Sequence, residues 1–308
     1  MNKKKAAALG IIIFLLALGI YLFFQPLHMP TWMSYPYDVT IYKGKAKINA
    51  YLAEEREISI PKRILGAKVC VIEDYVFDDK ADIIILNIPE SVTEARFIYH
   101  HDSQSYYHLL PDNKSRMREY MGNEKEVVIP KEVWGRTVTE TQYSFIDTDV
   151  EKVVIPDTVT YIGIGSFEGC KNLKEIILPS QLKDIEADAF KKAGIESIYF
   201  PDSVDYIGTG AFELSCIEEV AGLENVESIG NSAFSGTPWE EKIEGNFVCI
   251  DDILYLYWGN TSEVLIPSFV KEIRGAFYIG EDYPYPCNVK KVFIPDSVTA
   301  ISAYSFGH

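Results

Sequence analysis

The chain has 308 residues, 47% of them hydrophobic, and a formal net charge of −16. This apolar content is sufficient for a folded core, and the strong negative charge disfavours nucleic acid and anionic lipid surfaces as partners. The 5 cysteines show no C-x-x-C spacing, so neither a disulfide framework nor a zinc or redox centre is predicted.

An uncharged run from Ala6 to Phe24 follows lysines at positions 3–5. As a helix rising about 1.5 Å per residue, this run spans roughly 28 Å, close to the thickness of a bilayer core. The lysines place the N-terminus in the cytoplasm and the rest of the chain outside. A cleaved signal peptide is the alternative, although residues 25–30 contain no small-x-small cleavage site. Both interpretations predict export of the remaining chain, which would be secreted after cleavage.

A pattern of four apolar positions repeats along most of the remaining chain. In its clearest copies a proline is followed at three, six and eleven positions by an aliphatic residue, an isoleucine and a phenylalanine: Pro156, Val159, Ile162 and Phe167; Pro179, Leu182, Ile185 and Phe190; Pro201, Val204, Ile207 and Phe212. A unit of 22 or 23 residues cannot bury its apolar face alone, whereas stacked copies can. The pattern therefore predicts one elongated solenoid.

Further copies bring the predicted total to nine units. Their prolines are Pro61, Pro89, Pro130, Pro267 and Pro295, and Leu223 takes the proline's place in one copy. The units of Pro61 and Pro130 use a longer entry loop that contains Gly66 or Gly135. Residues 96–120 and 237–262 interrupt the pattern and are predicted to be insertions.

Each unit predicts a short β-strand that ends at its proline, because proline cannot donate a ladder hydrogen bond. A turn, a second extended run and a bend at Gly163, Gly208 or Gly230 follow. The phenylalanine then lies on a short helical turn. We expect Phe190, like its equivalents, to be buried between successive coils.

The repeated unit resembles the BspA-like (treponemal-type) class of leucine-rich repeat, over roughly Ile58 to the C-terminus. The departures are Leu223, the irregular stretch after Pro89, and a last unit that stops at His308, which predicts a truncated or uncapped end. The resemblance implies a leucine-rich repeat solenoid of stacked short parallel strands with short helical turns. It also implies a surface protein, since BspA-like proteins are known as bacterial adhesins.

The resulting domain prediction has four parts. Residues 1–5 form a cytoplasmic basic tail, 6–24 a transmembrane signal-anchor, 25–50 a juxtamembrane segment or N-terminal cap, and 51–308 the solenoid. The predicted function is non-catalytic binding of a protein or cell-surface macromolecule by a membrane-anchored extracellular protein. An envelope-structural or scaffold protein without a soluble ligand is the alternative. The sequence leaves the ligand's identity and the oligomeric state open.

Residues with reactive side chains form no catalytic pattern, and no metal or cofactor is predicted. GIGSFEG at Gly163 recurs as GTGAFEL at Gly208, so it is interpreted as the repeat turn. His100, His101 and His108 near Asp102 match no standard ligand spacing and are interpreted as surface-loop residues, with a metal site as the alternative. Three cysteines are predicted to be small buried thiols and a fourth to lie in an apolar strand: Cys170, Cys216 and Cys287, and Cys249.

The alternation of side chains along each strand predicts a binding face. The residue three before each proline should point inward, and the residue two before it outward: Ser59, Asn87, Val128, Val154, Ile177, Tyr199, Ala221, Leu265 and Phe293. A mostly acidic row, four before the proline, lies beside it: Glu57, Ile85, Glu126, Lys152, Glu175, Ser197, Glu219, Glu263 and Lys291. The candidate ligand-binding residues are Val154, Ile177, Tyr199, Leu265 and Phe293 with Glu175 and Glu219. The alternative is that another layer covers this face, as in parallel sheets buried on both sides.

Residues 96–120 offer a second binding hypothesis. The segment has a net charge of +1 and carries five aromatic residues: Phe97, Tyr99, Tyr106, Tyr107 and Tyr120. Insertions in solenoids often form binding loops. The alternative is a degenerate repeat whose aromatic side chains complete the core.

Overall fold

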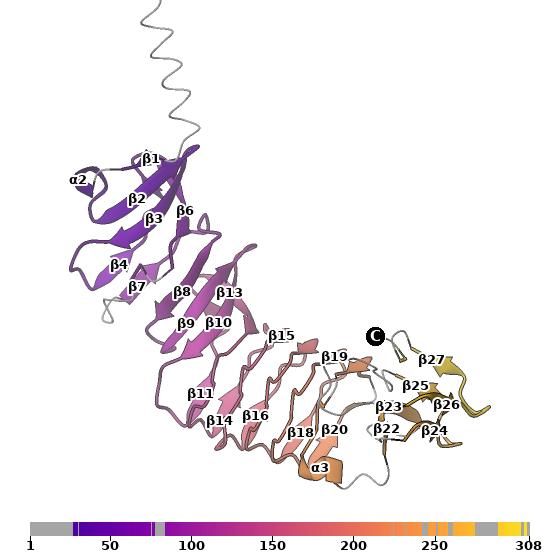
Figure 1. Cartoon of the computed structure of the whole chain (residues 1–308). Helices are drawn as coiled ribbons and strands as arrows, with labels where there is room; N and C mark the ends of the chain where they lie inside the picture. The colour runs from indigo at the N-terminus through magenta and orange to yellow at the C-terminus, as the bar shows by residue number, and fades with distance from the viewer. Residues whose placement is uncertain are drawn as a thin grey trace, which may run out of the picture. The chain divides into compact units, whose positions relative to one another are not determined.

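The structure, a computed structural model, describes residues 27–29, 31–74, 76–77, 84–223, 225–230, 232–241, 246–250, 252–257, 261–274, 289–302 and 305–306. Figure 1 labels the helices and strands of the chain, which divides into two compact units. Unit 1 is Met1–Arg116 with Glu132–Thr137, and unit 2 is Met117–Lys131 with Val138–His308. The predicted transmembrane segment 6–24 lies outside the described residues. Among those that are described, no helix has the length and apolar character needed to cross a bilayer.

Unit 1 consists mainly of β-strands. Its elements are β1 (Leu27–His28), α2 (Thr31–Ser34), β2 (Tyr37–Tyr42), β3 (Lys45–Tyr51), β4 (Glu57–Ser59), β5 (Arg63–Ile64), β6 (Ala67–Ile72), β7 (Ile84–Asn87), β8 (Ala95–His100), β9 (Ser105–Leu110) and β12 (Glu132–Val133). Strands β2 and β3 form an antiparallel hairpin, and β3 pairs in parallel with β6. Ile48 on β3 and Ile72 on β6 are paired and buried, so the hairpin shares its core with the first repeat.

The two longer entry loops fold as tight hairpins. One joins β5 to β6 through Leu65 and Gly66, whose φ angles are 49° and 82°. The other joins β12 to β13 (Arg136–Thr141) through Trp134 and Gly135, with φ angles of 50° and 73°. Positive φ at both central residues is the requirement of a type I′ turn, which glycine meets without steric cost.

The predicted insertion at 96–120 consists mostly of strands rather than of a loop. It covers most of β8, all of β9 and β10 (Lys114–Tyr120), and β8 pairs antiparallel with β9. Tyr107 and Tyr120 are buried, whereas Phe97, Tyr99 and Tyr106 are half-buried. The structure therefore favours the alternative in which aromatic side chains of this segment complete the core.

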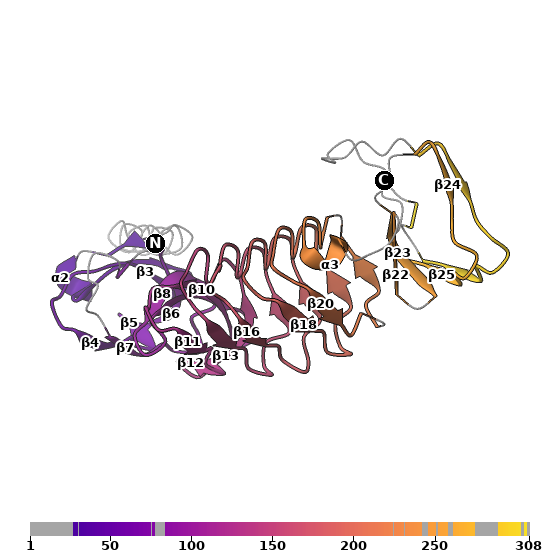
Figure 2. The ribbon, with the colours of Figure 1, turned by 90° about the horizontal axis from the view of Figure 1, so that it is seen from below.

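Unit 2 contains the stacked coils, seen side by side in Figure 2. Strands that precede the proline positions are β11 (Glu126–Val128), β14 (Lys152–Val154), β16 (Glu175–Ile177), β18 (Ser197–Tyr199), β20 (Glu219–Ala221), β24 (Glu263–Leu265) and β26 (Lys291–Phe293). Those that follow are β15 (Tyr161–Ile162), β17 (Asp184–Ile185), β19 (Tyr206–Ile207), β21 (Ser228–Ile229), β25 (Glu272–Ile273) and β27 (Ala300–Ile301). All the strand pairs between these coils are parallel and in register, which confirms the predicted stacking of short parallel strands in this unit.

The repeat phenylalanines form a continuous stack through the coils. Adjacent rings from Phe145 to Phe234, through Phe167, Phe190 and Phe212, lie 5.2, 4.9, 5.0 and 5.1 Å apart with interplanar angles of 7° or less. Tyr120 and Trp239 pack against the two end rings at tilted angles. The phenylalanines lie on turns and not on the predicted helical turns. In the first four, the backbone N–H donates to a carbonyl of the next coil instead of one within its own turn.

The repeat glycines serve close packing rather than the predicted bend. Gly163, Gly208 and Gly230 do not have positive φ angles. A Cβ added at Gly208 would lie 2.5 Å from the backbone nitrogen of Ala187, and one at Gly163 would overlap the carbonyl oxygen of Thr141. Each glycine therefore lets its own coil approach the backbone of the coil before it.

The second predicted insertion, 237–262, contributes α3 (Pro238–Glu241) and a hairpin of β22 (Phe247–Ile250) and β23 (Ile253–Tyr257). Strand β23 pairs in parallel with β25, so the hairpin continues the stack. The buried Tyr255 hydroxyl donates to the carbonyl of Leu223 at 2.8 Å. This bond ties the hairpin to the unit that lacks the proline.

Candidate binding groove

The predicted outward row is largely solvent-exposed. Tyr199 is 66% exposed, Leu265 71% and Ile177 44%. Ser59, Asn87, Val128, Ala221 and Phe293 are also exposed, and only Val154 is half-buried. No other layer covers the described part of this row, so these apolar side chains are available for contact.

The predicted acidic row is also exposed except at two positions. Lys152 is half-buried, and Ile85 is buried, which corrects the expectation that it points outward. The cause is a register shift between β4 and β7 that pairs Ile85 with the inward-facing Ile58. A bulge of this kind turns one side chain to the opposite face.

The parallel ladder of strands is interrupted within this face. β11, β14 and β16 form one sheet, β18 and β20 form another, and among the described strands none pairs with β16 on its far side. The coils remain connected on both sides of the interruption. The N–H of Gly194 donates to the carbonyl of Cys170 at 3.0 Å, and the Ser203 hydroxyl donates to the carbonyl of Leu182 at 2.7 Å.

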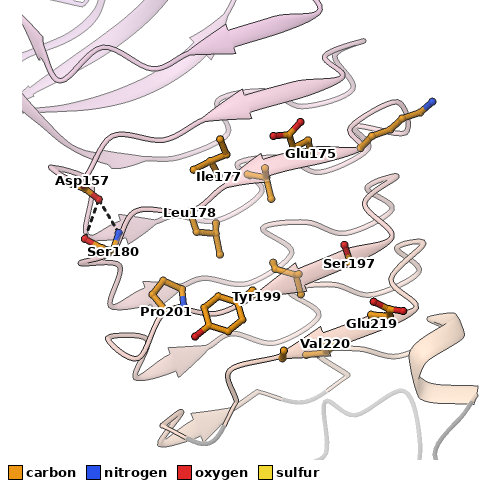
Figure 3. Close-up of a pocket in the computed structure, with 14 residues that line it drawn as sticks. Asp157, Glu175, Ile177, Leu178, Ser180, Ser197, Tyr199, Pro201, Glu219 and Val220 are labelled. Carbon is orange, nitrogen blue, oxygen red and sulfur yellow. Dashed lines mark hydrogen bonds between the residues drawn. The ribbon is translucent and has the colours of Figure 1, made fainter.

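A groove of about 800 Å³ lies at this interruption (Figure 3). The lining includes all of β16, β18 and β20. Ile177 and Tyr199 stand on either side of the groove, and Glu175 and Glu219 lie toward one end (Figure 3). Four of the seven predicted binding residues therefore meet at one groove, while Val154, Leu265 and Phe293 are not part of its lining.

The acidic side chains around the groove differ in whether a neighbouring group neutralises them. The Lys152 ammonium lies 2.7 Å from Glu175, and this hydrogen bond raises the pKa of Lys152. Asp157 accepts a hydrogen bond from the backbone N–H of Ser180, which lowers the pKa of its carboxyl group. Glu219 has no ion-pair partner among the described residues. The groove thus combines an apolar centre with a carboxylate, that of Glu219, which no described cationic side chain compensates.

Residues 141–252 match the family model of the BspA type leucine rich repeat region, with 6 copies. The chain contains a BspA-type leucine-rich repeat region. This match confirms the predicted resemblance, and the described lining of the groove lies wholly within the matched BspA-type repeats.

Several solved structures are similar to the chain. A T. pallidum leucine rich repeat protein has 23% identity, covering 64% of this chain and 83% of that chain, with a TM-score of 0.41. A leucine rich cell surface protein from Faecalibacterium prausnitzii has 20% identity, covering 68% of this chain and 73% of that chain, with a TM-score of 0.39. The pneumococcal vaccine antigen PcpA has 18% identity, covering 90% of this chain and 66% of that chain, with a TM-score of 0.37. No match was found among curated proteins.

The cysteines of the BspA-type repeats differ in exposure. Cys170 is buried, its thiol lies 2.9 Å from the carbonyl of Phe145, and burial raises its pKa to about 11. Cys216 is exposed, which corrects the prediction of a buried thiol. In its unit, Ser215 occupies the repeat position that Cys170 holds, and Cys216 comes one residue later. Cys249 lies in β22 as predicted, and Cys287 is outside the described residues.

The histidine cluster belongs to unit 1 and precedes the residues that match the BspA-type repeat in the sequence. His100 ends β8 and packs edge-on against Trp134, with ring centroids 4.9 Å apart, and desolvation by burial lowers its pKa. His101 lies in the turn that follows, and His108 lies on β9. Within the described ranges no group of three His, Cys, Asp or Glu residues could hold a metal ion.

Sequence reasoning missed the interruption of the sheet, although the repeat spacing contains a signal for it. Phe167 precedes Pro179 by 12 positions, whereas Phe190 precedes Pro201 by 11. The shorter coil brings Gly194 against the carbonyl of Lys171, where an added Cβ would overlap the oxygen. The groove occurs where these two BspA-type units of unequal length meet.

Proposed function

We propose that the chain is a non-catalytic, membrane-anchored protein whose repeats face the cell exterior and bind another protein, as an adhesin does. The groove between β16 and β18 supports this proposal. An exposed apolar patch with a polar rim is typical of protein interfaces, and large aromatic side chains such as Tyr199 often dominate their binding energy. Solenoids use extended surfaces of this kind for recognition.

The groove is tested by changing its two central apolar side chains together. We expect Tyr199→Ala with Ile177→Ser to weaken capture of a partner protein about 30-fold, because losing an interface hot spot costs about 2 kcal/mol. The immobilised full chain in detergent would be incubated with cell-surface protein extracts, and captured proteins would be quantified by mass spectrometry at several concentrations.

Val128→Ser is the matched control, since Val128 occupies the same repeat position, is exposed and lies outside the groove. The Val128→Ser variant should capture the same protein as the wild type, and with the same affinity. Equal capture by all three proteins would contradict the proposed binding site, whereas no specific capture by any of them would favour an envelope-structural role.

The anchor is tested separately. If residues 6–24 remain as a transmembrane helix, the mature protein should keep its original N-terminal sequence and stay in the membrane fraction after carbonate washing. N-terminal sequencing and fractionation measure these two properties. A mature N-terminus beyond residue 25 would instead show that the repeats are secreted.

A further inference from the structure

We propose that the groove binds an extended segment of the partner protein in which an apolar residue and a lysine or arginine lie two positions apart. This inference rests on the proposed function and specifies the chemistry of the partner at the same site.

The open strand edges favour an extended ligand. β16 ends its sheet and β18 begins the next, so their facing edges lack a paired strand among the described residues. Unpaired edges present backbone N–H and C=O groups that an added strand can use. Each edge strand has three residues, or about 10 Å at about 3.3 Å per residue, which suits a short segment rather than a whole domain.

The spacing of the groove residues determines the spacing in the ligand. Along β16 the acidic Glu175 and the apolar Ile177 are two residues apart and face the same way. Tyr199 extends the apolar row on β18, and Glu219 extends the acidic row on β20. A strand lying along the groove presents residues i and i+2 on one face, so one can meet the apolar row and the other the acidic row.

Charge determines which polar residue fits. Glu175 and Glu219 lie at one end of the groove and Asp157 toward the other, and the lining contains a single lysine, Lys174. Lys152 already neutralises Glu175 in part, whereas Glu219 has no ion-pair partner among the described residues. The chain's net charge of −16 further disfavours an acidic ligand. A cationic side chain is therefore the complement of this end of the groove.

Selection from a displayed library of random octapeptides tests this inference. The full chain in detergent would be the bait, and sequencing would count the peptides before and after selection. We expect at least tenfold enrichment of peptides with a Leu, Ile, Val, Phe or Tyr two positions from a Lys or Arg. Glu219→Gln should reduce that enrichment, and Glu219→Lys should shift it toward Asp or Glu. Glu126→Lys, a matched change in the same exposed row outside the groove, should leave it unchanged.

Three outcomes would overturn the inference: no enriched peptide, enrichment without a basic residue, or the same peptides on Glu219→Lys as on the wild type. Peptides that lack the predicted pattern yet are lost on Tyr199→Ala would overturn this inference and leave the proposed function intact. Equal partner capture by the Tyr199→Ala, Ile177→Ser variant would overturn the groove as the binding site, and failure of the wild-type chain to capture any protein would overturn the proposed function.

Discussion

Replacing Phe190 by alanine is expected to lower the free energy of unfolding of the repeats by about 3–5 kcal/mol. The side chain is 0% exposed and stacks on Phe167 at 4.9 Å and on Phe212 at 5.0 Å. The substitution loses the transfer free energy of the ring and leaves a cavity between two coils. Because each coil contacts mainly its neighbours, the damage should begin locally.

Hydrogen exchange followed by mass spectrometry measures this effect coil by coil. Protection should fall first in the coils that carry Phe167, Phe190 and Phe212. Leu214→Ala is the matched control, because Leu214 is an apolar residue on the same series of turns but is exposed. Unchanged protection in the Phe190→Ala variant would show that the stack does not hold the coils together.

Replacing Gly208 by alanine is expected to destabilise the same region by about 1–3 kcal/mol, the usual cost of overpacking. The new methyl group would lie 2.5 Å from the nitrogen of Ala187 and 2.6 Å from the carbonyl carbon of Glu186. Both are backbone atoms, and the N–H of Gly208 is held to the carbonyl of Ile185 at 2.6 Å. The coils can relieve the clash only by moving apart.

The equivalent position one coil earlier supplies the control. Glu186 follows Ile185 as Gly208 follows Ile207, and it already has a side chain. Glu186→Ala should therefore change the urea midpoint much less than Gly208→Ala does. Equal midpoints for the two variants would mean that close approach at Gly208 does not limit the packing of the coils.

The periodic part of the fold was predictable because burial repeats with the sequence. Phe190 and Ile207 are buried, and Tyr199 faces outward, as the offsets from each proline indicate. The packing role of Gly208 was not predictable, because a glycine required for close approach of two backbones and a glycine required for a bend look the same in the sequence. Its φ angle and its distance to Ala187 had to come from the structure.

The groove was predicted only in part. Alternation along single strands placed Ile177, Tyr199, Glu175 and Glu219 on one face, but pairing between strands depends on how coils of different length adapt to each other. The extra position between Phe167 and Pro179 shows that two neighbouring coils differ in length, but this difference alone does not specify that β16 and β18 separate. The prediction for Ile85 was wrong because it also depended on pairing between strands. A bulge between β4 and β7 turns this side chain inward, and the sequence of β7 alone does not indicate that bulge.

The phenylalanine stack also bears on how such a protein can evolve. Every interior ring contacts the ring before it and the ring after it, while Tyr120 and Trp239 tilt against the two ends at 37° and 59°. Recombination that duplicates or deletes the codons of one interior coil would still leave each interior ring between two equivalent rings and both ends intact. Chains with different numbers of coils should therefore be accessible in single genetic steps, each with a binding face of a different length.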